Sequence, residues 1–387
     1  MLKTLAVANY RSLRQLALPL TTLNVVSGEN GCGKSNLYRA LRLLAETARG
    51  GVVAALAREG GLSSALWAGP ETFSREMRAG EQPVQGGPRR DVVSLRLGFA
   101  TQDFSYCIDL GLPTPSSSAF ANDPEIKREC IWAGEQMRPS SMLVDRRGPV
   151  VQVRSEDGDW RVINSSLATF DSMLTEVADP ARAPEILTMR ELIRSWRFYD
   201  HFRTDLDAPA RQQQLGTRTP VLSNDGRDLA AAMQTIREIG DGEALDRAVA
   251  DAFEGAQLEV VCGEGRFEVL VRQHGLLRPL ASAELSDGTL RYLLWIAALL
   301  TPRPPALMVL NEPETSLHPD LLPALARLMA EAAKRTQLWV VSHSSRLIAA
   351  LEENEHCSSI VLKKELGETH VHGQGLLQRP TWKWPSR

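Results

Sequence analysis

Residues 22–41 read TLNVVSGENGCGKSNLYRAL, and this stretch decides how the rest of the chain is interpreted. The apolar segment LNVV predicts a strand, the glycine-rich run after it predicts a turn, and a helix is expected next. Gly28, Gly33, Lys34 and Ser35 match the pattern G-x-x-x-x-G-K-[ST]. Such glycines let backbone N–H groups face inward, and the helix start adds positive partial charge. The stretch therefore predicts a phosphate-binding loop.

The side chains of this loop have expected roles. Lys34 is expected to contact the β- and γ-phosphates of a nucleotide, and the Ser35 hydroxyl to ligate Mg²⁺. The other residues expected to contact the nucleotide are Gly28, Asn30, Gly31, Gly33 and Asn36. Ordinary glycine turns are the alternative, but strand, loop and helix stand in the required order. Cys32 lies inside the loop, where a redox-sensitive brake and a merely variable position are both open.

Composition narrows the class of protein. A chain of 387 residues exceeds one small domain, and its 43% hydrophobic and 24% charged content is typical of a globular protein. A net charge of −3 excludes a global basic field, so any contact with nucleic acid needs a local patch. The five cysteines lack metal-ligand spacing and favour a reducing compartment. The N-terminus lacks the pattern of a signal peptide, and the longest apolar run, residues 293–300, is too short to span a bilayer. We therefore expect a cytoplasmic protein.

Periodicity divides the chain into three predicted ranges. Residues 1–165 are expected to hold the phosphate loop and an antiparallel β layer, because short alternating segments are separated by turn residues. Residues 166–256 show helical periodicity without a heptad repeat, which predicts a helical insertion lobe and not a coiled-coil rod. Residues 257–387 are expected to complete the same unit. Strands of the β layer are expected at 91–99, 104–110, 126–133, 142–146, 150–154 and 160–163. Helices of the middle range are expected at 167–177, 184–199, 229–239 and 243–253.

A second buried strand, predicted at 306–310, ends in Asn311-Glu312-Pro313-Glu314. In a chain with a phosphate loop, an acidic residue just past such a strand indicates the element that holds Mg²⁺ and polarises the attacking water. Glu312 fits the second role. Asn311 stands where an aspartate is usual, so it offers an oxygen that can hold Mg²⁺ through a water but lacks the charge. The alternative is a strand followed by an acidic loop.

Two more short motifs follow buried or capped elements. Ser286, Asp287 and Gly288 open an apolar helix, where they are either a simple cap or a second anion site at a helix N-terminus. A strand predicted at 337–341 leads into Ser342-His343-Ser344. A single histidine at a strand end is by itself most often a loop residue.

Taken together, the phosphate loop, LSDGT (285–289), LNEPETSLHP (310–319) and VVSHS (340–344) resemble the ABC-type ATPase heads of the RecF/SMC/OLD group. The chain is most similar to bacterial AAA-type ATPases of that group that lack a long coiled coil. The resemblance is strong over residues 2–44 and 285–347, and it extends to 222–229 (LSNDGRDL). No Q-loop glutamine can be assigned, and no Toprim nuclease domain is expected in this polypeptide.

The resemblance implies an α/β P-loop NTPase fold with a mixed central sheet, an antiparallel β layer and a helical insertion lobe. It implies ATP and Mg²⁺ as cofactors and a homodimer that closes around ATP. Ser286, Asp287 and Gly288 of one chain would cover the phosphates bound by the other. Glu312 and His343 would be catalytic, with Glu312 orienting water and His343 sensing the γ-phosphate. Residues 315–318 correspond to the D-loop.

Members of this group commonly act on DNA in repair, recombination or anti-phage defence, which makes DNA and an accessory nuclease or effector the expected partners. Local support comes from three basic pairs, Arg89-Arg90, Arg146-Arg147 and Lys363-Lys364, although such pairs are more often solvated surface. The alternative is a slow or inactive ATPase that serves as a nucleotide-gated switch for a protein partner. An ABC importer subunit is a weaker third reading.

Overall fold

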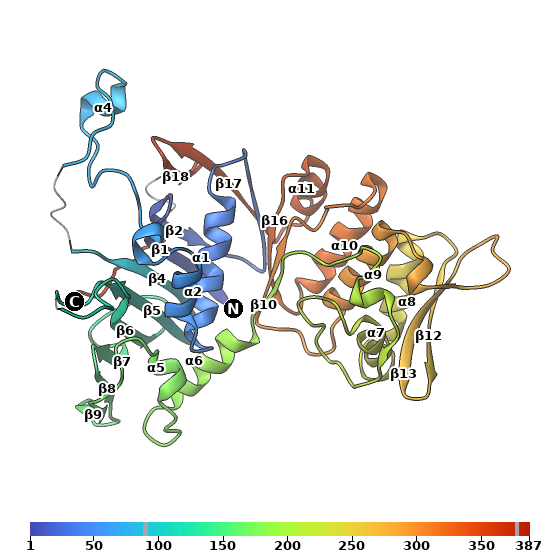
Figure 1. The fold of residues 1–387 in the computed structure, drawn as a ribbon, viewed down its shortest axis with the longest axis horizontal. Coiled ribbons are helices and arrows are strands. Elements are labelled where there is room, and N and C mark those ends of the chain that lie inside the picture. Colours follow the sequence, from blue (N-terminus) through green and yellow to red (C-terminus); the bar gives the residue numbers. More distant parts are fainter. Residues whose placement is uncertain (88–91, 116, 376–378) are drawn as a thin grey trace. The chain divides into compact units, whose positions relative to one another are not determined.

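The computed structural model describes residues 1–87, 92–115, 117–375 and 379–387 (Figure 1). The chain forms two compact units. Unit 1 comprises Met1–Leu20, Gly28–Ser195 and Ile360–Arg387. Unit 2 comprises Thr21–Ser27 and Trp196–Ser359. The helical range predicted at 166–256 is therefore divided between the two units after Ser195.

Unit 1 is built on an eight-stranded sheet in the order β2-β1-β4-β5-β6-β7-β8-β9 (Figure 1). Its strands are β1 (Leu2–Tyr10), β2 (Leu13–Pro19), β4 (Leu95–Thr101), β5 (Phe104–Gly111), β6 (Glu125–Ala133), β7 (Met142–Arg147), β8 (Val150–Arg154) and β9 (Trp160–Asn164). Every neighbouring pair is antiparallel, so the predicted antiparallel β layer is confirmed.

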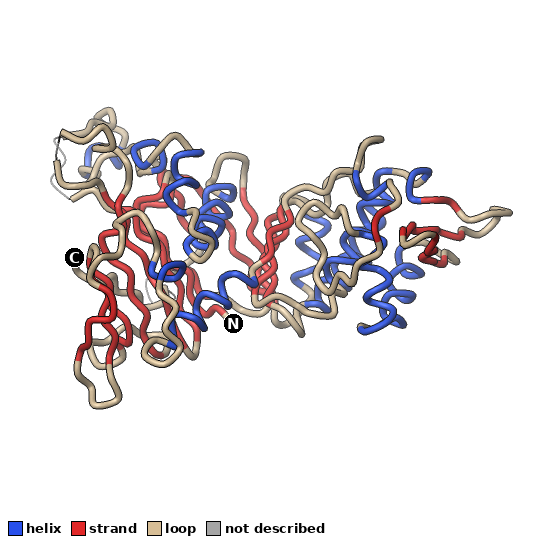
Figure 2. Tube along the Cα trace, turned by 60° about the horizontal axis from the view of Figure 1, so that its bottom comes forward, coloured by secondary structure: helices blue, strands red, loops and turns tan. Residues whose placement is uncertain are grey.

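Helices cover one face of this sheet (Figure 2). The longest are α1 (Lys34–Thr47), α2 (Val52–Arg58) and α6 (Pro184–Ser195), and the shorter ones are α3 (Leu62–Ala65) and α5 (Met173–Glu176). Helix α4 (Arg75–Ala79) has no buried residue and stands away from the sheet (Figure 1). On α1 the fully buried Leu37, Leu41 and Leu44 recur at helical spacing and form the packing face. Burial of this face, and not helix propensity, is what stabilises α1.

A buried ion pair lies beneath these helices. Arg146 Nη1 donates to Glu129 Oε2 over 2.6 Å, and both side chains are fully buried. The Tyr106 hydroxyl donates to the other oxygen of Glu129 over 2.7 Å, and burial raises the pKa of Tyr106 well above its usual value. Arg146 also donates to the carbonyl of Ala168 over 2.8 Å. That bond explains why the helix predicted at 167–177 is wrong except at α5, because the chain there turns its carbonyls toward Arg146.

The central element of unit 2 is a parallel sheet in the order β10-β15-β16-β3. Its strands are β10 (Arg197–Tyr199), β15 (Leu307–Asn311), β16 (Gln337–Val341) and β3 (Leu23–Gly28), of which residues 23–27 belong to this unit. The strands are almost wholly apolar, as expected for a parallel sheet buried on both faces. Strand β10 corrects the prediction that a helix runs over 184–199, since the helix ends at Ser195. Closely spaced apolar residues do not by themselves distinguish a buried strand from a helix.

Helices and a small second sheet complete unit 2. The helices are α7 (Leu229–Ile239), α8 (Gly242–Ala252), α9 (Asp287–Leu299), α10 (Leu322–Ala332) and α11 (Ser345–Glu352), with 3₁₀ turns η1 (Pro209–Arg211), η2 (Ser282–Glu284) and η3 (Pro319–Leu321). The small antiparallel sheet contains β11 (Gln214–Leu215), β12 (Gln257–Gly263), β13 (Arg266–Arg272) and β14 (Leu280–Ala281). Helix α9 is buried from Leu290 onward and forms the core of the unit.

The chain then returns to unit 1 through the hairpin β17 (Cys357–Glu365) and β18 (Glu368–Val371), which the sequence patterns did not reveal. A parallel sheet with flanking helices and a separate antiparallel layer confirm the predicted α/β fold class. None of the helices in the described parts of the chain is long and apolar enough to cross a membrane.

Candidate functional site

The phosphate loop lies in unit 1 and connects β3 to α1. Gly28, Gly31 and Gly33 all have positive φ angles, of 139°, 79° and 113°. A Cβ atom on Gly28 would lie 2.3 Å from the carbonyl oxygen of Leu362, and one on Gly33 would lie 2.2 Å from Thr369 Oγ1. Both positions therefore require glycine for conformation and for space.

Lys34 is the first residue of α1, and its side chain folds back over the loop. Its Nζ donates to the carbonyl of Gly28 over 2.6 Å and to that of Glu29 over 3.0 Å, and the residue is only 8% exposed. No side chain caps the N-terminus of α1. The first-turn N–H groups and the ammonium group are thus the donors that the loop offers to an anion.

A network of small hydroxyl groups holds the loop from behind. Thr369 Oγ1 donates to the carbonyl of Cys32 over 2.7 Å and lies 2.7 Å from Ser12 Oγ. Asn36 Nδ2 donates to the same Ser12 oxygen over 2.8 Å. Asn36 was predicted to contact the nucleotide, and its side chain here supports the loop. Ser12 and Thr369 were missed because no motif links residues so far apart in the chain.

The remaining loop residues are placed as follows. Asn30, Gly31 and Ser35 are exposed at the loop and at the start of α1. Cys32 is 3% exposed, and its sulfur lies beneath Gly28, 2.8 Å from where a Cβ on that glycine would be. A reactive thiol has to be accessible, so the burial of Cys32 argues against the redox-sensitive brake.

A carboxylate–histidine cluster lies in unit 2, past the ends of β15 and β16. His343 Nδ1 is 3.7 Å from Glu312 Oε1 and 3.6 Å from Glu314 Oε1. The side chains of His343 and Glu312 are about half exposed, at 54% and 46%, whereas that of Glu314 is 7% exposed. Glu312 has a φ of 50°, a conformation that costs energy in a residue with a side chain and is common at functional sites.

Glu314 fixes the geometry of this cluster. Its Oε1 accepts hydrogen bonds from Ser342 Oγ over 2.7 Å, from the N–H of His343 over 3.0 Å and from the N–H of Ser344 over 3.1 Å. One buried carboxylate thus holds the histidine loop against the loop that carries Glu312. The sequence contains Glu314 within LNEPETSLHP, but nothing in the motif distinguishes its role from that of Glu312.

The parallel register places another carboxyl group beside Asn311. Tyr199 of β10 pairs with Leu310 of β15, so Asp200 and Asn311 occupy neighbouring positions at the carboxyl edge of the sheet. Burial raises the pKa of Asp200 from 3.8 to about 6. Ligands of open α/β sheets bind at this edge, which makes Asp200 a candidate site residue. The helix predicted over 184–199 gave no reason to expect a strand end there.

Ser286 is the N-cap of α9, and its Oγ accepts from the N–H of Thr289 over 3.2 Å. Asp287 bonds to Arg211, whose Nη2 lies 2.6 Å from Asp287 Oδ1 and whose Nη1 donates to the carbonyl of Leu285 over 2.7 Å. The buried Arg211 therefore holds the start of α9 in place. The simple cap predicted for Ser286 is present, together with an exposed helix start that can receive an anion.

Helix α9 also contacts the loop after β15. Arg291 Nη1 donates to the carbonyl of Thr315 over 3.0 Å, and Trp295 Nε1 donates to that of Pro313 over 3.0 Å. A Cβ on Gly288 would lie 3.1 Å from the carbonyl oxygen of Ser316. The segments 286–288 and 313–316 thus form one packed block within unit 2.

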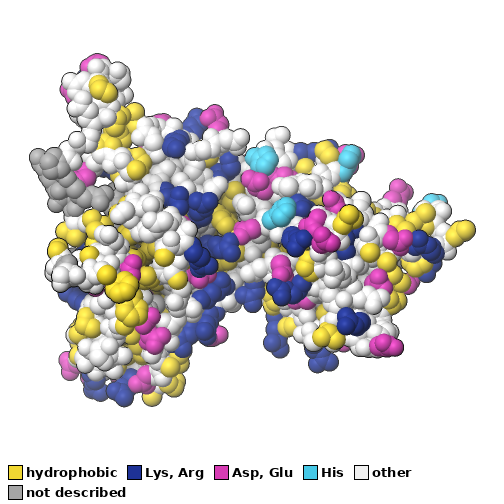
Figure 3. Space-filling model, in the orientation of Figure 1, with side chains coloured by type: hydrophobic (Ala, Val, Ile, Leu, Met, Phe, Trp, Pro, Cys, Tyr) yellow, Lys and Arg dark blue, Asp and Glu magenta, His cyan; other side chains and the backbone are white. Residues whose placement is uncertain are grey.

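Of the three basic pairs, Arg89-Arg90 lies outside the described residues. Arg146 is buried in its ion pair with Glu129, so the second pair is not the surface feature considered above, although Arg147 is 62% exposed. Lys363-Lys364 is exposed on β17. Acidic and basic side chains are interspersed over unit 2 on the face drawn in Figure 3.

The fold and the glycine loop define the class as a P-loop ATPase. A family model described as "AAA domain, putative AbiEii toxin, Type IV TA system" matches residues 23–349, and the chain belongs to this family. The match confirms the predicted relationship to AAA-type ATPases. A search of curated proteins gives no match.

Solved structures of SMC heads are among those that match this chain. An SmcHead bound to the C-winged helix domain of ScpA shares 13% identity, with 97% of this chain and 98% of that chain covered and a TM-score of 0.49. The head domain from Thermotoga maritima shares 14%, with 97% and 99% covered and a TM-score of 0.44. A Pyrococcus furiosus Smc head with an extended coiled coil, bound to the C-terminal domain of ScpA, shares 13%, with 96% and 95% covered and a TM-score of 0.48.

Proposed function

We propose that this protein binds ATP with Mg²⁺, closes as a homodimer around it, and hydrolyses it slowly. The observation that carries the proposal is the phosphate loop, where three glycines with positive φ, an uncapped helix start and the Lys34 ammonium group converge. Lys34 neutralises the β- and γ-phosphates in this proposal, and backbone N–H groups of the loop bind them.

The residues present fit a magnesium ion. Mg²⁺ in nucleotide sites keeps several waters and takes oxygens from the phosphates, so few protein ligands are needed. The exposed Ser35 hydroxyl and the half-buried Asn311 amide supply neutral oxygens of the right kind. Within the described ranges no group of three or more His, Cys, Asp and Glu side chains is placed to hold a metal ion. When bound, the ion offsets phosphate charge.

Glu312 is the residue that we propose orients and polarises the attacking water. It is half exposed, and His343 lies within 3.7 Å of its carboxylate, where the imidazole can sense a phosphate. Glu314 positions His343 through the backbone and does not itself touch the reactants. The neutral Asn311 lowers the negative charge near the metal. Changes in groups that contact a metal's ligands alter activity by roughly 10–100-fold, so we expect slow turnover.

Dimer closure is proposed through Ser286, Asp287 and Gly288, which would cover the phosphates bound by the partner copy. Light scattering of Glu312→Gln protein with and without ATP tests it, since this variant traps ATP. We expect the mass to double with ATP and to remain monomeric with Ser286→Arg, which retains ATP binding. Thr188→Arg, at an exposed position on α6, is the control and should still dimerise. A Glu312→Gln protein that stays monomeric with ATP refutes the dimer.

We propose that the ATPase acts on DNA in repair, recombination or defence against phage, with an accessory nuclease or effector as partner. The family description names a toxin of a toxin–antitoxin system, which favours the defence setting. The test is DNA binding at several salt concentrations with and without ATP, because phosphate contacts make affinity salt-dependent. DNA affinity that ATP leaves unchanged argues against this role.

The second candidate is a nucleotide-gated switch that acts on a protein partner. Asn311 favours it, since a weakly held metal lengthens the ATP-bound state. The two candidates differ in turnover. A rate that DNA stimulates supports the first, and a rate that stays negligible with DNA while ATP still drives dimers supports the switch.

A further inference from the structure

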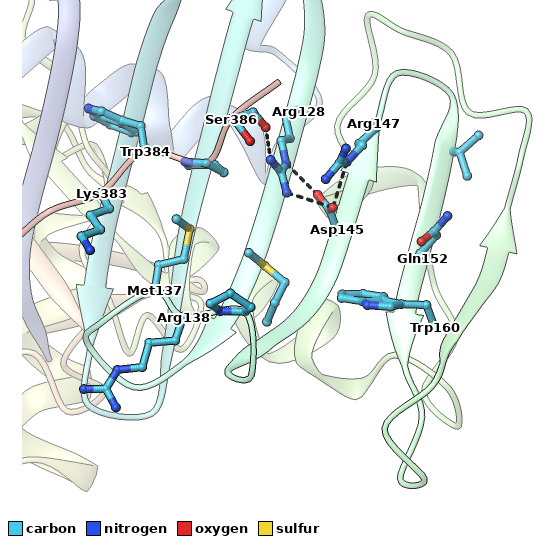
Figure 4. Close-up of a pocket in the computed structure, with 14 residues that line it drawn as sticks. Arg128, Met137, Arg138, Asp145, Arg147, Gln152, Trp160, Lys383, Trp384 and Ser386 are labelled. Carbon is cyan, nitrogen blue, oxygen red and sulfur yellow. Dashed lines mark hydrogen bonds and ion pairs between the residues drawn. The ribbon is translucent and has the colours of Figure 1, made fainter.

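A groove crosses the second face of the unit 1 sheet, away from the phosphate loop residues. Strand side chains alternate between faces, so Arg128 and Arg147 point opposite to Glu129 and Arg146, which lie beneath the helices. The groove has a volume of about 710 Å³ (Figure 4). Residues 383–386 line one side of it, and the neighbouring Trp382 packs close to the sheet, since a Cβ on Gly98 would lie 2.7 Å from its ring.

The groove is basic. Four basic side chains, Arg128, Arg138, Arg147 and Lys383, line it against the single carboxylate of Asp145, which gives it a net charge of +3. Asp145 is saturated by its neighbours. Arg128 donates to its two oxygens over 2.8 and 2.9 Å, and Arg147 Nε donates to Oδ2 over 3.0 Å. Arg138 and Lys383 are exposed, so the groove attracts anions despite the net negative charge of the chain.

The groove is also aromatic. Trp160 and Trp384 lie at opposite ends of it, with the Asp145 cluster between them (Figure 4). Trp160 is 41% exposed on the edge strand β9, and the guanidinium of Arg154 lies 5.9 Å from its ring. Trp384 contacts Trp382 edge to face, with ring centroids 5.2 Å apart, which fixes its orientation. Of the two rings Trp160 is the more exposed, whereas Trp384 is half-buried and packs against a small apolar cluster that contains Trp132 and Met142.

We propose that this groove binds single-stranded nucleic acid, with bases stacked on Trp160 and Trp384 and phosphates near Arg138, Arg147 and Lys383. Stacking platforms combined with cations are what sequence-tolerant single-strand sites use. An acidic peptide would use the cations but leave the indole faces bare, and a duplex would keep its base faces hidden. The groove is the surface on which the proposed action on DNA would take place. Only the cellular role of the groove, and not its binding of single strands, rests on the proposed function.

Fluorescence anisotropy of a labelled 15-nucleotide oligo-dT with the full chain tests the proposal. Loss of one stacked base costs about 1–3 kcal/mol, so Trp160→Ala should weaken binding about 5- to 150-fold. Arg138→Gln combined with Lys383→Gln should weaken it further and flatten the salt dependence, since the slope is about −0.7 per phosphate neutralised. Arg161→Gln is the matched control, because Arg161 is a neighbour on β9 that pairs with Asp157 outside the groove, and it should bind normally.

Three results would overturn the proposal. The first is normal oligo-dT binding by Trp160→Ala, and the second is equal displacement by a base-free polyanion such as polyphosphate. The third is tighter binding of polyglutamate than of oligo-dT to wild type. Lys34→Ala separates this groove from the ATP site, since it should bind oligo-dT normally. If the protein binds oligo-dT but does not dimerise with ATP, the groove proposal stands and the dimer proposal is refuted.

Discussion

The phosphate loop of unit 1 and the carboxylate–histidine cluster of unit 2 are built in different ways. In the loop the backbone provides the donors, and glycine is required because Leu362 and Thr369 come within 2.3 and 2.2 Å of a Cβ position. In the cluster side chains provide the chemistry, and the buried Glu314 holds them in place. A site built from the backbone is visible in the sequence as a glycine motif. A site built from side chains depends here on Glu314, which the sequence does not distinguish from Glu312.

The largest expected effect comes from removing the Lys34 ammonium group, which leaves the backbone of the phosphate loop unchanged. Lys34→Ala should weaken ATP binding at least about 100-fold, because a buried or clamped charge on phosphate contributes several kcal/mol. Isothermal titration with ATP is the measurement. Arg39→Ala, an exposed position on the same helix, should bind like wild type. Unchanged ATP affinity in Lys34→Ala would remove the loop from the ATP site.

The next effect separates the two glutamates of the cluster. Glu314→Ala removes the oxygen that accepts three hydrogen bonds, so it should lower the free energy of unfolding by about 1–3 kcal/mol and reduce turnover. Glu312→Gln should abolish turnover but leave the unfolding free energy unchanged, since Glu312 is half exposed. Urea unfolding and a steady-state ATPase assay measure both. If the two variants lose stability equally, Glu314 does not organise the cluster.

Asn311→Asp tests the neutral position at the end of β15. The added charge should lower the Mg²⁺ concentration needed for half-maximal ATPase rate by about 10-fold, the low end of the range for groups that contact a metal's ligands. The rate is measured against Mg²⁺ for wild type, Asn311→Asp and Glu312→Gln. An unaltered Mg²⁺ dependence means that Asn311 is not near the metal, and the switch candidate then loses its physical motive.

The smallest effect concerns Asp200 and pH. Its pKa is raised by burial to about 6, so the folded state holds this proton more tightly than the unfolded state does. The resulting stabilisation is present below pH 3.8 and is lost as the pH rises through 6. Asp200→Asn lacks this loss, so its stability relative to wild type should be higher at pH 8 than at pH 4. Urea unfolding at both values, with the exposed Asp207→Asn as control, measures it, and no pH dependence refutes the assignment.

The sequence predicted the parts of this molecule that local patterns determine. The phosphate loop, β16 at Gln337–Val341 and α7 at Leu229–Ile239 lie where glycine spacing and periodicity put them. Strand β10 was missed because its apolar residues continue the spacing of α6. The support of the loop was missed because Ser12 and Thr369 are 357 residues apart, and only the folded chain brings them together.

Helix α9 joins two roles that the proposed dimer would separate between copies. It begins at Ser286, and further along Arg291 and Trp295 hold the loop that follows β15. If Ser286 covers the partner's ATP, the state of one nucleotide is transmitted through a single rigid helix to the hydrolytic loop of the other site. The two ATP sites of the dimer would then act cooperatively. The ATPase rate should therefore rise sigmoidally with ATP concentration, with a Hill coefficient above 1 and at most 2. Helix α9 would then be the element that couples nucleotide binding at one site to hydrolysis at the other.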